Sequence, residues 1–380
     1  MKAAVIGAGM MGSAMAYDLA GSDGVERVLL ADIDAERAAQ VASAIGDGVE
    51  PRTIDTRDAA SLRALFREVD VVLGATSYNH NAALTEAAIQ TGTHCCDLGG
   101  NMDVVLEQMR LDERAKAAGV LVLPNCGLAP GLACIVGAGG TRRFDSVDAV
   151  HVRVGGLPQH PQPPLNYQLV FSAEGLLNEY IEPAEVIEAG ARRTVASMTG
   201  LEALSFRMPY AELEAFHTSG GASTLPAMFD GAVRELDYKT IRYAGHCDRF
   251  RTLLELGFAS AEPIVVGSSV RTAREIFEEM LRRKLPASGP DVVLMRVTVR
   301  GRMAGAEKTL AYEMIDHYDE HLRLTAMMRT TAFPTSIIAQ MVVRGEIEDR
   351  GVLPPERCVP LGPLFAELAK RNIVIHESLS

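Results

Sequence analysis

The 380-residue sequence lacks the features that mark several protein classes. Its two short basic runs, Arg142-Arg143 and Arg282-Arg283-Lys284, are flanked by neutral or acidic residues, and the formal net charge is -12. Nucleic-acid-binding proteins neutralise phosphates with clustered Lys and Arg, so this charge balance argues against a nucleic-acid partner. There is also no internal repeat and no low-complexity linker. With 48% apolar and 23% charged residues, the composition is that of an ordinary globular protein.

The six cysteines form no recognisable framework. There is no CxxC pair and no His at zinc-finger spacing, so we expect free thiols in a reducing compartment and no metal site. The N-terminus lacks the basic and apolar regions of a signal peptide, which predicts a cytoplasmic protein. The uncharged stretch 117–140 is long enough to span a bilayer, but Pro124 and Pro130 interrupt it. We therefore expect this stretch to be buried in a soluble domain, with no membrane contact.

The length of the chain exceeds what one hydrophobic core usually supports, which predicts two domains. In residues 1–124, short apolar runs alternate with helical stretches. This alternation is typical of parallel strands that helices bury on both faces, so we expect an α/β domain with a doubly wound parallel sheet. The expected strands are 2–6, 28–32, 71–73, 94–97 and 120–123, and the expected helices are 13–20, 35–45, 61–68, 82–90 and 104–118.

Beyond residue 124 the pattern changes. Strand-like segments now alternate apolar and polar residues or carry charges, which is typical of an antiparallel or mixed sheet with one solvent-exposed face. We therefore expect residues 125–380 to form a second, α+β domain with a mixed sheet. Gly301 and Gly305 lie between two long strand-like runs and predict a hairpin. The amphipathic stretch 335–344 predicts a late helix, which we expect to pack back on the first domain.

A glycine turn joins the first expected strand to the first expected helix. Its sequence, GAGMMG at residues 7–12, matches the pattern GxGxxG. Gly7 permits the tight turn, Gly9 lets the backbone approach a diphosphate, and Gly12 allows close contact between helix and strand. The helix N-terminus then offers free N–H groups to the anion. This pattern alone has many false matches, but its position between strand and helix predicts a Rossmann dinucleotide-binding site.

The residue that closes the second expected strand indicates which cofactor binds. Asp32 lies 20 residues after Gly12, where a carboxylate accepts hydrogen bonds from the adenosine ribose hydroxyls and repels a 2′-phosphate. Ile33 follows directly, and the nearest Arg is Arg37 in the next helix. The sequence therefore predicts NAD rather than NADP.

Further cofactor contacts are expected where strands end. Asp55 follows Ile54, and Thr76-Ser77 follow the strand at 71–73, where adenine and nicotinamide-ribose contacts are found in this fold. A helix cap or a polar loop residue is an equally good interpretation of each. The predicted cofactor-binding residues are Gly7, Gly9, Met10, Met11, Gly12, Asp32, Ile33, Asp55, Thr76, Ser77, Asn79, Leu98 and Gly99.

Two segments near the expected domain boundary are candidates for the reacting end. Asp97 ends a strand at the edge where open α/β sheets bind ligands, so it is a candidate for holding a substrate ammonium or for acid–base catalysis. A structural cap on the next helix is the equally weighted alternative. The loop 124–131 marks the crossing between the expected domains and lines a cleft by its position. Asn125 and Cys126 in this loop are therefore candidate substrate ligands.

The second expected domain concentrates hydrogen-bond donors in the sequences HTSGG and DYKTIRYAGH. Period-two alternation places Arg242 and Lys239 on opposite faces of a strand. Arg242 is a candidate bidentate clamp for a substrate carboxylate, and a rim salt bridge is the alternative. His217 and His246 are candidate proton carriers, although a lone His is more often a satisfied loop residue. Lys239 is a further candidate substrate ligand.

Together these segments resemble the saccharopine dehydrogenase family over nearly the whole chain. The resemblance rests on GAGMMG, CCDLGGN, LPNCGLAPGL, VGGLPQHPQPPLNYQLVFSAEGLLNEY, LEAFHTSGGASTLP and ELDYKTIRYAGH, of which the last four are long and unusual. It implies a Rossmann domain, a mixed-sheet dimerising domain and an active site between them. The residues that it implies face the active site are Asp97, the loop 125–131, Glu174, Tyr180, Thr218 and Arg242.

The resemblance also implies an activity. Saccharopine reductases of this family usually carry basic or hydroxyl residues where this chain has Asp32, so the branch that oxidatively deaminates lysine with NAD is favoured. The expected reaction converts L-lysine at its 6-amino group to 2-aminoadipate 6-semialdehyde and ammonia, in a homodimer or higher homo-oligomer. A saccharopine or carboxynorspermidine type reductase, acting by imine reduction, is one alternative, and a non-catalytic NAD-binding sensor is another.

The expected chemistry requires a base. Hydride does not leave readily from a carbon that bears an ammonium, and the lysine side-chain amine has an ordinary pKa of about 10.4. Desolvation or a neighbouring base must therefore remove a proton from the substrate amine. Asp97, His217 and His246 are alternative candidates for that base, and the sequence does not choose among them.

Overall fold

The computed structural model describes every residue of the chain except 171 and 287, and it divides into two compact units. The sequence suggested a single boundary at residue 124, but the first unit extends beyond it and takes up a second, later section of the chain. The first unit comprises Met1–Arg142 and Met328–Val374, and the second comprises Arg143–Met327 and Ile375–Ser380.

The extension of the first unit has a packing reason. Helix α7 (Leu132–Thr141), which follows the expected boundary, packs against α13 (Pro355–Cys358) and α14 (Leu361–Lys370). At Gly139 of α7, an added Cβ would collide with the side chain of Leu361, so the absence of a side chain permits this approach. The stretch 335–344 also lies in the first unit, mostly within helix α12.

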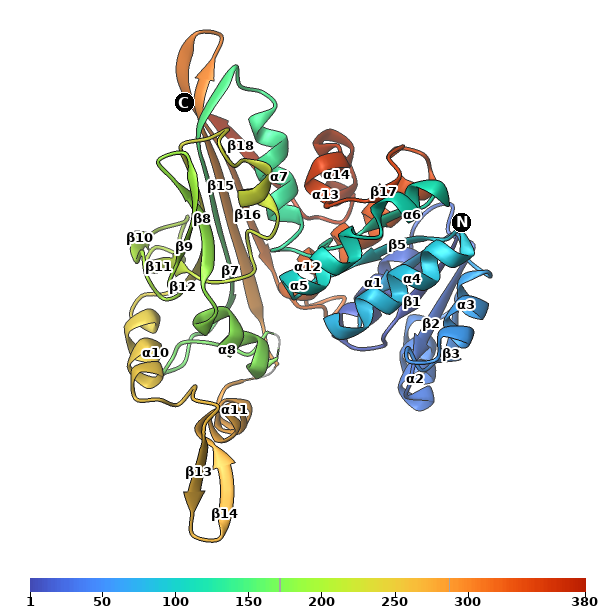
Figure 1. The fold of residues 1–380 in the computed structure, drawn as a ribbon, viewed down its shortest axis with the longest axis horizontal. Helices are drawn as coiled ribbons and strands as arrows, with labels where there is room; N and C mark the ends of the chain where they lie inside the picture. The colour runs from blue at the N-terminus through green and yellow to red at the C-terminus, as the bar shows by residue number, and fades with distance from the viewer. Residues whose placement is uncertain (171, 287) are drawn as a thin grey trace. The chain divides into compact units, whose positions relative to one another are not determined.

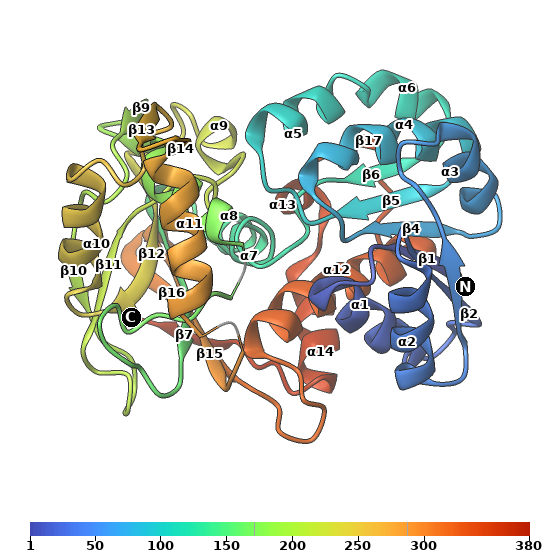
Figure 2. The same ribbon diagram turned by 90° about the horizontal axis from the view of Figure 1, so that it is seen from below.

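The first unit is built on a seven-stranded parallel sheet that helices cover on both faces (Figure 2). In spatial order its strands are β3 (Val49–Thr53), β2 (Arg27–Asp32), β1 (Lys2–Ile6), β4 (Val71–Gly74), β5 (His94–Asp97), β6 (Leu121–Leu123) and β17 (Gly351–Val352). Its other helices are α1 (Met10–Ala20), α2 (Ala35–Ile45), α3 (Ala59–Phe66), α4 (Asn81–Thr91), α5 (Met102–Met109), α6 (Asp112–Ala117) and α12 (Ala326–Val343). This strand order confirms the predicted Rossmann sheet, whose order reverses between β1 and β4.

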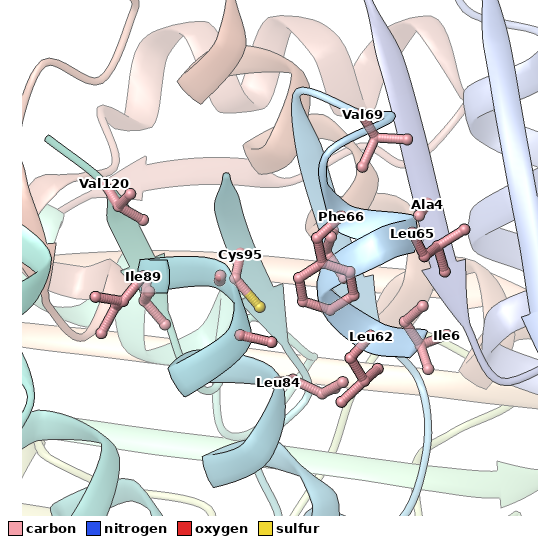
Figure 3. Close-up of a cluster of buried hydrophobic side chains, with 14 of the residues drawn as sticks. Ala4, Ile6, Leu62, Leu65, Phe66, Val69, Leu84, Ile89, Cys95 and Val120 are labelled. Atoms are coloured by element: carbon pink, nitrogen blue, oxygen red, sulfur yellow. The ribbon is translucent and has the colours of Figure 1, made fainter. Parts of the chain in front are cut away.

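The short apolar runs form strands because both sides of each strand are buried. Ala4 and Ile6 of β1 belong to one buried cluster with Phe66 of α3 (Figure 3). Ala3 and Val5, which alternate with them, are also fully buried. A strand covered on both faces needs apolar side chains at every position, which is why these runs are continuous rather than alternating.

Two elements of this unit differ from the sequence expectation. Strand β3 was not expected, because it lies at the sheet edge, is partly exposed and contains Pro51 and charged residues instead of a continuous apolar run. The helix expected at 104–118 is divided into α5 and α6, which are separated at Arg110 and Leu111.

The second unit contains a mixed sheet of nine strands, with long strands β7, β15 and β16 at its centre (Figure 1). In spatial order these are β10 (Glu202–Leu204), β11 (Leu213–His217), β12 (Glu235–Tyr243), β7 (Ser146–Pro158), β15 (Asp291–Met303), β16 (Ala306–His317) and β18 (His376–Leu379), with β8 (Ala184–Glu188) and β9 (Ala191–Val195) attached at β12. A separate hairpin joins β13 (Pro263–Val266) and β14 (Ser269–Thr272), and the helices are α8 (Ala173–Ile181), α9 (Leu225–Met228), α10 (His246–Glu255) and α11 (Ala273–Lys284). The β12–β7 pair is parallel and the other pairs are antiparallel, which confirms the predicted mixed sheet.

The second sheet has buried side chains on both faces near β11 and β12. Phe216 of β11 packs in one buried cluster with Tyr180 of α8 and Phe250 of α10. Ala215, its neighbour in the strand, belongs to a different cluster with Ile241 of β12. Because successive side chains in a strand point to opposite faces, these two clusters lie on the two sides of the sheet.

None of the helices in the described part of the chain is long and apolar enough to cross a membrane.

Candidate functional site

The glycine turn of the first unit has the geometry of a diphosphate cradle. Gly7 has a φ of 107°, and a Cβ there would lie 2.7 Å from the Ala75 carbonyl oxygen. A Cβ on Gly12 would collide with the carbonyl of Gly7, whereas a Cβ on Gly9 would meet nothing within 4 Å. Gly7 and Gly12 are therefore required by the turn itself, and Gly9 borders open space. Helix α1 begins at Met10 without a side-chain cap, so its first N–H groups remain available to an anion.

Asp32 is fixed against this turn. Its Oδ2 accepts a hydrogen bond of 2.7 Å from the backbone N–H of Ala8, and its Oδ1 accepts one of 2.9 Å from Asp34. Each carboxylate oxygen keeps further acceptor capacity. Asp32 and the exposed Ile33 line a pocket of about 300 Å³ that begins at Gly7. The pocket therefore joins the start of the glycine turn to the residue expected to bind the adenosine ribose.

The other predicted cofactor residues are distributed around this region. Asp55 and Thr76 line the pocket, and the Thr76 hydroxyl is buried without a hydrogen-bond partner among the described residues. An orphaned hydroxyl beside an open cradle fits a site completed by a polar ligand. Ser77 and Asn79, which are hydrogen-bonded to each other at 3.3 Å, do not line the pocket. The remaining predicted residues, Met10, Met11, Leu98 and Gly99, also lie outside the pocket lining.

Three polar residues that line the pocket were not predicted: Thr56, Arg57 and His80. Arg57 forms a bidentate contact with Asp55, with N–O distances from 2.7 to 3.1 Å. These hydrogen bonds lower the pKa of Asp55 to about 2. The negative charge of Asp55 and the positive charge of Arg57 therefore already neutralise each other. Thr56 and Arg57 lie in the loop after β3, of which the sequence analysis had singled out only Asp55.

Asp97 is buried, and its carboxylate is hydrogen-bonded to the loops around it. Its Oδ1 accepts hydrogen bonds from the backbone N–H groups of Gly99 at 2.7 Å and Asn125 at 3.4 Å. Its Oδ2 accepts one of 2.6 Å from the Gln108 amide. Burial raises the pKa of Asp97, and the side chain is 1% exposed. A carboxylate enclosed in this way holds loops in position and does not present an oxygen to a substrate.

The loop beyond β6 places its two candidate residues differently from the sequence expectation. Asn125 is buried and has a φ of 63°, and its side chain occupies the space that a Cβ on Gly99 would need. Cys126 is fully buried, and its thiol donates a hydrogen bond of 3.3 Å to the Leu123 carbonyl. Side-chain contact between Cys126 and a substrate therefore has no support in the described geometry.

Arg242 of the second unit is a buried cation with unused donors. Its Nε donates a hydrogen bond of 2.7 Å to the Tyr180 hydroxyl, and its Nη1 donates one of 2.9 Å to the Ile241 carbonyl. The guanidinium lies over the rings of Tyr167 and Tyr180, at 4.8 and 5.6 Å from their centroids. No carboxylate pairs with Arg242 among the described residues, although only 3% of it is exposed. Such a site is suited to binding a carboxylate ligand.

A directional hydrogen-bond chain holds Arg242 in place. His246 Nδ1 lies 2.9 Å from the Leu165 carbonyl, which can only accept, so Nδ1 carries the proton. His246 Nε2 then accepts from the Tyr180 hydroxyl at 3.0 Å, and Tyr180 accepts from Arg242. Burial, followed by the charge of Arg242, lowers the pKa of His246 to about 3. His246 is therefore neutral near pH 7 and positions Tyr180, which makes it a poor general base.

The low pKa of His246 predicts a pH-dependent stability. The unfolded state binds a proton near pH 6.5 and the folded state only near pH 3, so stability is complete above pH 6.5 and is lost as the pH falls toward 3. At pH 4 the expected loss from this residue is about 3 kcal/mol. His246→Gln should remove this component. Urea unfolding followed by circular dichroism between pH 7 and 4 measures it, with exposed His160→Gln as the matched control. Equal pH slopes for the wild type and His246→Gln would contradict the prediction.

His217 and Lys239 lie on the other face of the sheet from Arg242. The His217 ring is 3.5 Å from the Asp237 carboxylate, and Lys239 Nζ is 2.7 Å from Glu202. Both belong to a network of paired charges that also includes Arg153. Hydrogen bonds and ion pairs hold the pKa of Asp237 well below its ordinary value. The structure therefore does not bring these two candidates together with Arg242, as strand alternation already indicated for Lys239.

The residues implied by family resemblance also separate into two groups. Tyr180 contacts Arg242, and Thr218 is hydrogen-bonded at 2.9 Å to Thr240 on the face of β12 that carries Arg242. Glu174 is exposed in the first turn of α8. A different acid of the same helix, Glu179, interacts electrostatically with Arg242 and was missed, since nothing in the helix pattern distinguishes it. Burial raises the pKa of Glu179 to about 7, with Arg242 opposing the shift.

Acidic, His and Cys side chains are the usual protein ligands of metal ions. Within residues 1–170, 172–286 and 288–380, no group of three or more such side chains is placed to hold a metal ion. The six cysteines are free thiols, and five of them are buried.

Comparison with known proteins places these features in a family. Residues 3–123 match the family model of the saccharopine dehydrogenase NADP binding domain, and residues 127–374 match that of the saccharopine dehydrogenase C-terminal domain. The chain belongs to the saccharopine dehydrogenase family. The family predicted from the sequence is thereby confirmed, and the protein is an oxidoreductase acting on CH–NH groups. The alternative of a non-catalytic sensor is set aside by this membership.

Individual relatives agree with this assignment. A saccharopine dehydrogenase [NADP(+), L-glutamate-forming] of Pyricularia oryzae is 22% identical, over 88% of this chain and 90% of that protein. A mitochondrial alpha-aminoadipic semialdehyde synthase of Mus musculus is 21% identical over 83% of this chain, which spans 41% of that longer protein. Apo saccharopine dehydrogenase (L-Glu forming) from Saccharomyces cerevisiae has the same fold, with a TM-score of 0.83 at 18% identity, over 100% of this chain and 99% of that one.

Proposed function

We propose that this protein catalyses the NAD-dependent oxidative deamination of L-lysine at its 6-amino group, giving 2-aminoadipate 6-semialdehyde and ammonia. The observation that carries the proposal is Asp32, whose carboxylate closes β2 and is hydrogen-bonded to the glycine turn. A carboxylate at this position favours the two ribose hydroxyls of NAD and repels the 2′-phosphate of NADP. The proposed cofactor thus differs from the NADP(+) that the names of the relatives specify.

The arginines near this pocket support the same preference. Arg57 is paired with Asp55 in a bidentate contact, and Arg37 lies 3.7 Å from the carboxylate of Asp34. NADP sites usually supply an Arg to the 2′-phosphate. Here each of these two arginines already has a carboxylate partner, and Asp32 would add like-charge repulsion.

Different residues of the chain would bind the cofactor and the substrate in the proposed reaction. Gly7, Gly9 and Gly12 would seat the diphosphate, and Asp32 would bind the adenosine ribose. When bound, the oxidised nicotinamide ring accepts a hydride from the substrate carbon. Arg242 would hold the α-carboxylate of lysine, and binding energy at that remote end would orient the terminal amine.

The proposed reaction also requires the substrate amine to lose a proton. Loss of a proton and a hydride leaves an imine at carbon 6, and water then adds to it and releases ammonia. Of the three bases considered from the sequence, Asp97 is enclosed, His217 lies on the opposite sheet face and His246 is fixed as a neutral acceptor. Desolvation of the substrate amine lowers its pKa without requiring a protein base, and we favour this route.

A second candidate function is the cleavage or formation of saccharopine by imine reduction, which the names of the relatives favour. The carboxynorspermidine type of reduction belongs to the same alternative. These reactions need a second amino acid or an amine–aldehyde pair. Lysine deamination needs only lysine, NAD and water, so the two functions are separable by substrate requirement.

A substrate panel tests the proposal. Purified protein with NAD and L-lysine alone should form NADH and release ammonia in equal amounts, and NADP should support at most a hundredth of that rate. Turnover only with saccharopine, or only with an amine–aldehyde pair, would move the protein to the reductase alternative. Failure to bind either dinucleotide would end both assignments.

Location and assembly are further parts of the proposal. We infer a cytoplasmic enzyme, supported by the free thiols of the described residues, and a homodimer or higher homo-oligomer, supported by the family resemblance. Light scattering of the purified protein measures the assembly directly, and a monomeric mass at micromolar concentration would contradict it.

A further inference from the structure

The first unit contains a second cavity, at the end of α1 that lies away from the glycine turn. This distal pocket is lined by the ends of α1, α2 and α14 and by the last turns of α12, and its volume of about 450 Å³ is within the range of small-molecule sites. Helix α1 has 11 residues, so roughly 16 Å separate the glycine turn from the distal pocket. None of the described residues lines both this pocket and the one at Asp32, so the two are separate sites.

Three helices end at the wall of the distal pocket. The last residues of α1, α2 and α14, which are Ala20, Ile45 and Lys370, all line it. The C-terminal end of a helix carries a partial negative charge, because its last carbonyl groups have no partner within the helix. The three helix ends therefore favour a cation in the distal pocket.

The basic side chains of the distal pocket already have acidic partners. Arg371 is ion-paired with Asp18 and lies 2.9 Å from one carboxylate oxygen of Glu367. Lys370 Nζ lies 2.7 Å from the other oxygen of Glu367, and Arg344 is paired at 2.6 Å with a glutamate outside the pocket. An anionic ligand would have to compete with these carboxylates, so the lining is poorly suited to an anion.

Hydrogen-bond acceptors, by contrast, remain unused in the distal pocket. Asp23 and Asp47 are exposed at its rim, and neither has a hydrogen-bond or ion-pair partner among the described residues. At its floor, Gln340 is only 3% exposed, and its Oε1 lies 3.5 Å from Arg344 Nη1, which is longer than an ordinary hydrogen bond. A buried acceptor in this state lacks a good donor, and a ligand can supply one.

Asp18 is a second buried acceptor at the floor of the distal pocket. Its Oδ1 accepts from Arg371 and its Oδ2 accepts a hydrogen bond of 2.6 Å from the Ser336 hydroxyl, so each oxygen keeps further acceptor capacity. Burial raises the pKa of Asp18 although Arg371 opposes the shift. The ion pair therefore compensates the buried carboxylate only in part, and a cationic ligand would add to that compensation.

We propose that the distal pocket binds an aliphatic diamine, with one ammonium group hydrogen-bonded to Gln340 and Asp18 at the floor and the other facing Asp23 at the rim. An ammonium group supplies only donors, which matches a pocket whose unused groups are acceptors. An extended dication also suits these acceptors better than a metal ion does, because no three acidic, His or Cys side chains in the described parts of the chain are grouped to hold one. The inference goes beyond the proposed function and does not depend on it.

Calorimetry on the purified full-length protein tests this inference. The protein is titrated with 1,5-diaminopentane and with pentylamine, which has the same carbon chain but one ammonium group. The diamine should bind with a Kd below about 1 mM, and pentylamine should bind about tenfold more weakly because it lacks one charge-assisted contact. Equal affinities for the two amines, or no binding of the diamine at millimolar concentration, would overturn the inference.

The variant Asp23→Asn isolates the contact at the rim. It should weaken the binding of the diamine about tenfold and change that of pentylamine less than about threefold, so the preference for two ammonium groups disappears. Asp103→Asn, which removes an exposed carboxylate from α5 of the same unit, should keep the wild-type preference. Thermal unfolding checks that both variants are folded. If folded Asp23→Asn retains the wild-type preference, the diamine does not contact Asp23 and the inference is wrong.

Hydrogen exchange shows where the diamine binds. Bound 1,5-diaminopentane should slow amide exchange at residues 17–23 and 340–344, which line or adjoin the distal pocket. Protection confined to residues 143–327 would place the diamine in the second unit, near the proposed substrate site, and would overturn the inference. Displacement of the diamine by an equal concentration of Mg²⁺ would indicate a metal site instead, and it would overturn the inference as well.

Discussion

Arg242→Ala should raise the KM of L-lysine by roughly 100-fold to 1000-fold while leaving the affinity for NAD nearly unchanged. Arg242 is buried, is positioned by the Tyr180 hydroxyl and has no carboxylate partner among the described residues. Two charge-assisted hydrogen bonds to a substrate carboxylate, each worth about 1.5–3 kcal/mol, account for the size of the effect. Steady-state kinetics with lysine and calorimetry with NAD measure the two quantities separately.

Two controls make this result interpretable. Arg251→Ala removes a guanidinium from the exposed surface of α10 and should leave both constants unchanged. Arg242→Lys keeps the charge but loses the planar fork, so it should recover only part of the affinity. If Arg242→Ala folds normally and its KM for lysine equals that of the wild type, Arg242 does not bind the substrate, and the orientation proposed for lysine is wrong.

The sequence predicted those parts of the structure whose pattern is enforced by burial. Continuous apolar runs such as residues 3–6 of β1 indicated strands covered on both faces, and alternation in Glu235–Tyr243 placed Arg242 and Lys239 on opposite sides of a strand. Glycines were predictable for a related reason. Gly7 and Gly12 occupy positions where a Cβ would collide with backbone atoms. Only glycine fits there, so the spacing of the motif predicts the turn.

Other features depend on contacts that no local pattern records. Strand β3 is a partly exposed edge, so its sequence carries no apolar run, and Arg57 in the loop after it was missed. Asp97 looked equally like a catalytic acid and a structural residue, and only its contacts with Gln108 and two backbone N–H groups separate these roles. Glu179 and Glu174 are both acids of α8, and only the tertiary structure shows that Glu174 is exposed whereas Glu179 is partly buried and interacts electrostatically with Arg242.

Asp32→Ser should change the cofactor preference. We expect the Kd of NAD to rise about 100-fold, because the variant loses charge-assisted hydrogen bonds to the ribose hydroxyls. NADP should bind better to the variant than to the wild type, because the like charge facing its 2′-phosphate is removed. The ratio of the two dissociation constants, measured by calorimetry, should move from at least 100 in favour of NAD to near 1.

The carboxylate of Asp32 also holds Ala8 of the glycine turn, so its removal has a structural component. Asp32→Asn separates the two effects, since an amide oxygen can still accept from the Ala8 N–H while the negative charge is gone. If repulsion sets the preference, Asp32→Asn gains affinity for NADP with an intact turn, whereas a distorted turn weakens both cofactors equally. Exposed Asp47→Asn serves as the charge control. A wild-type protein that already prefers NADP would show that Asp32 does not exclude the phosphate, and the reductase alternative would then become the better assignment.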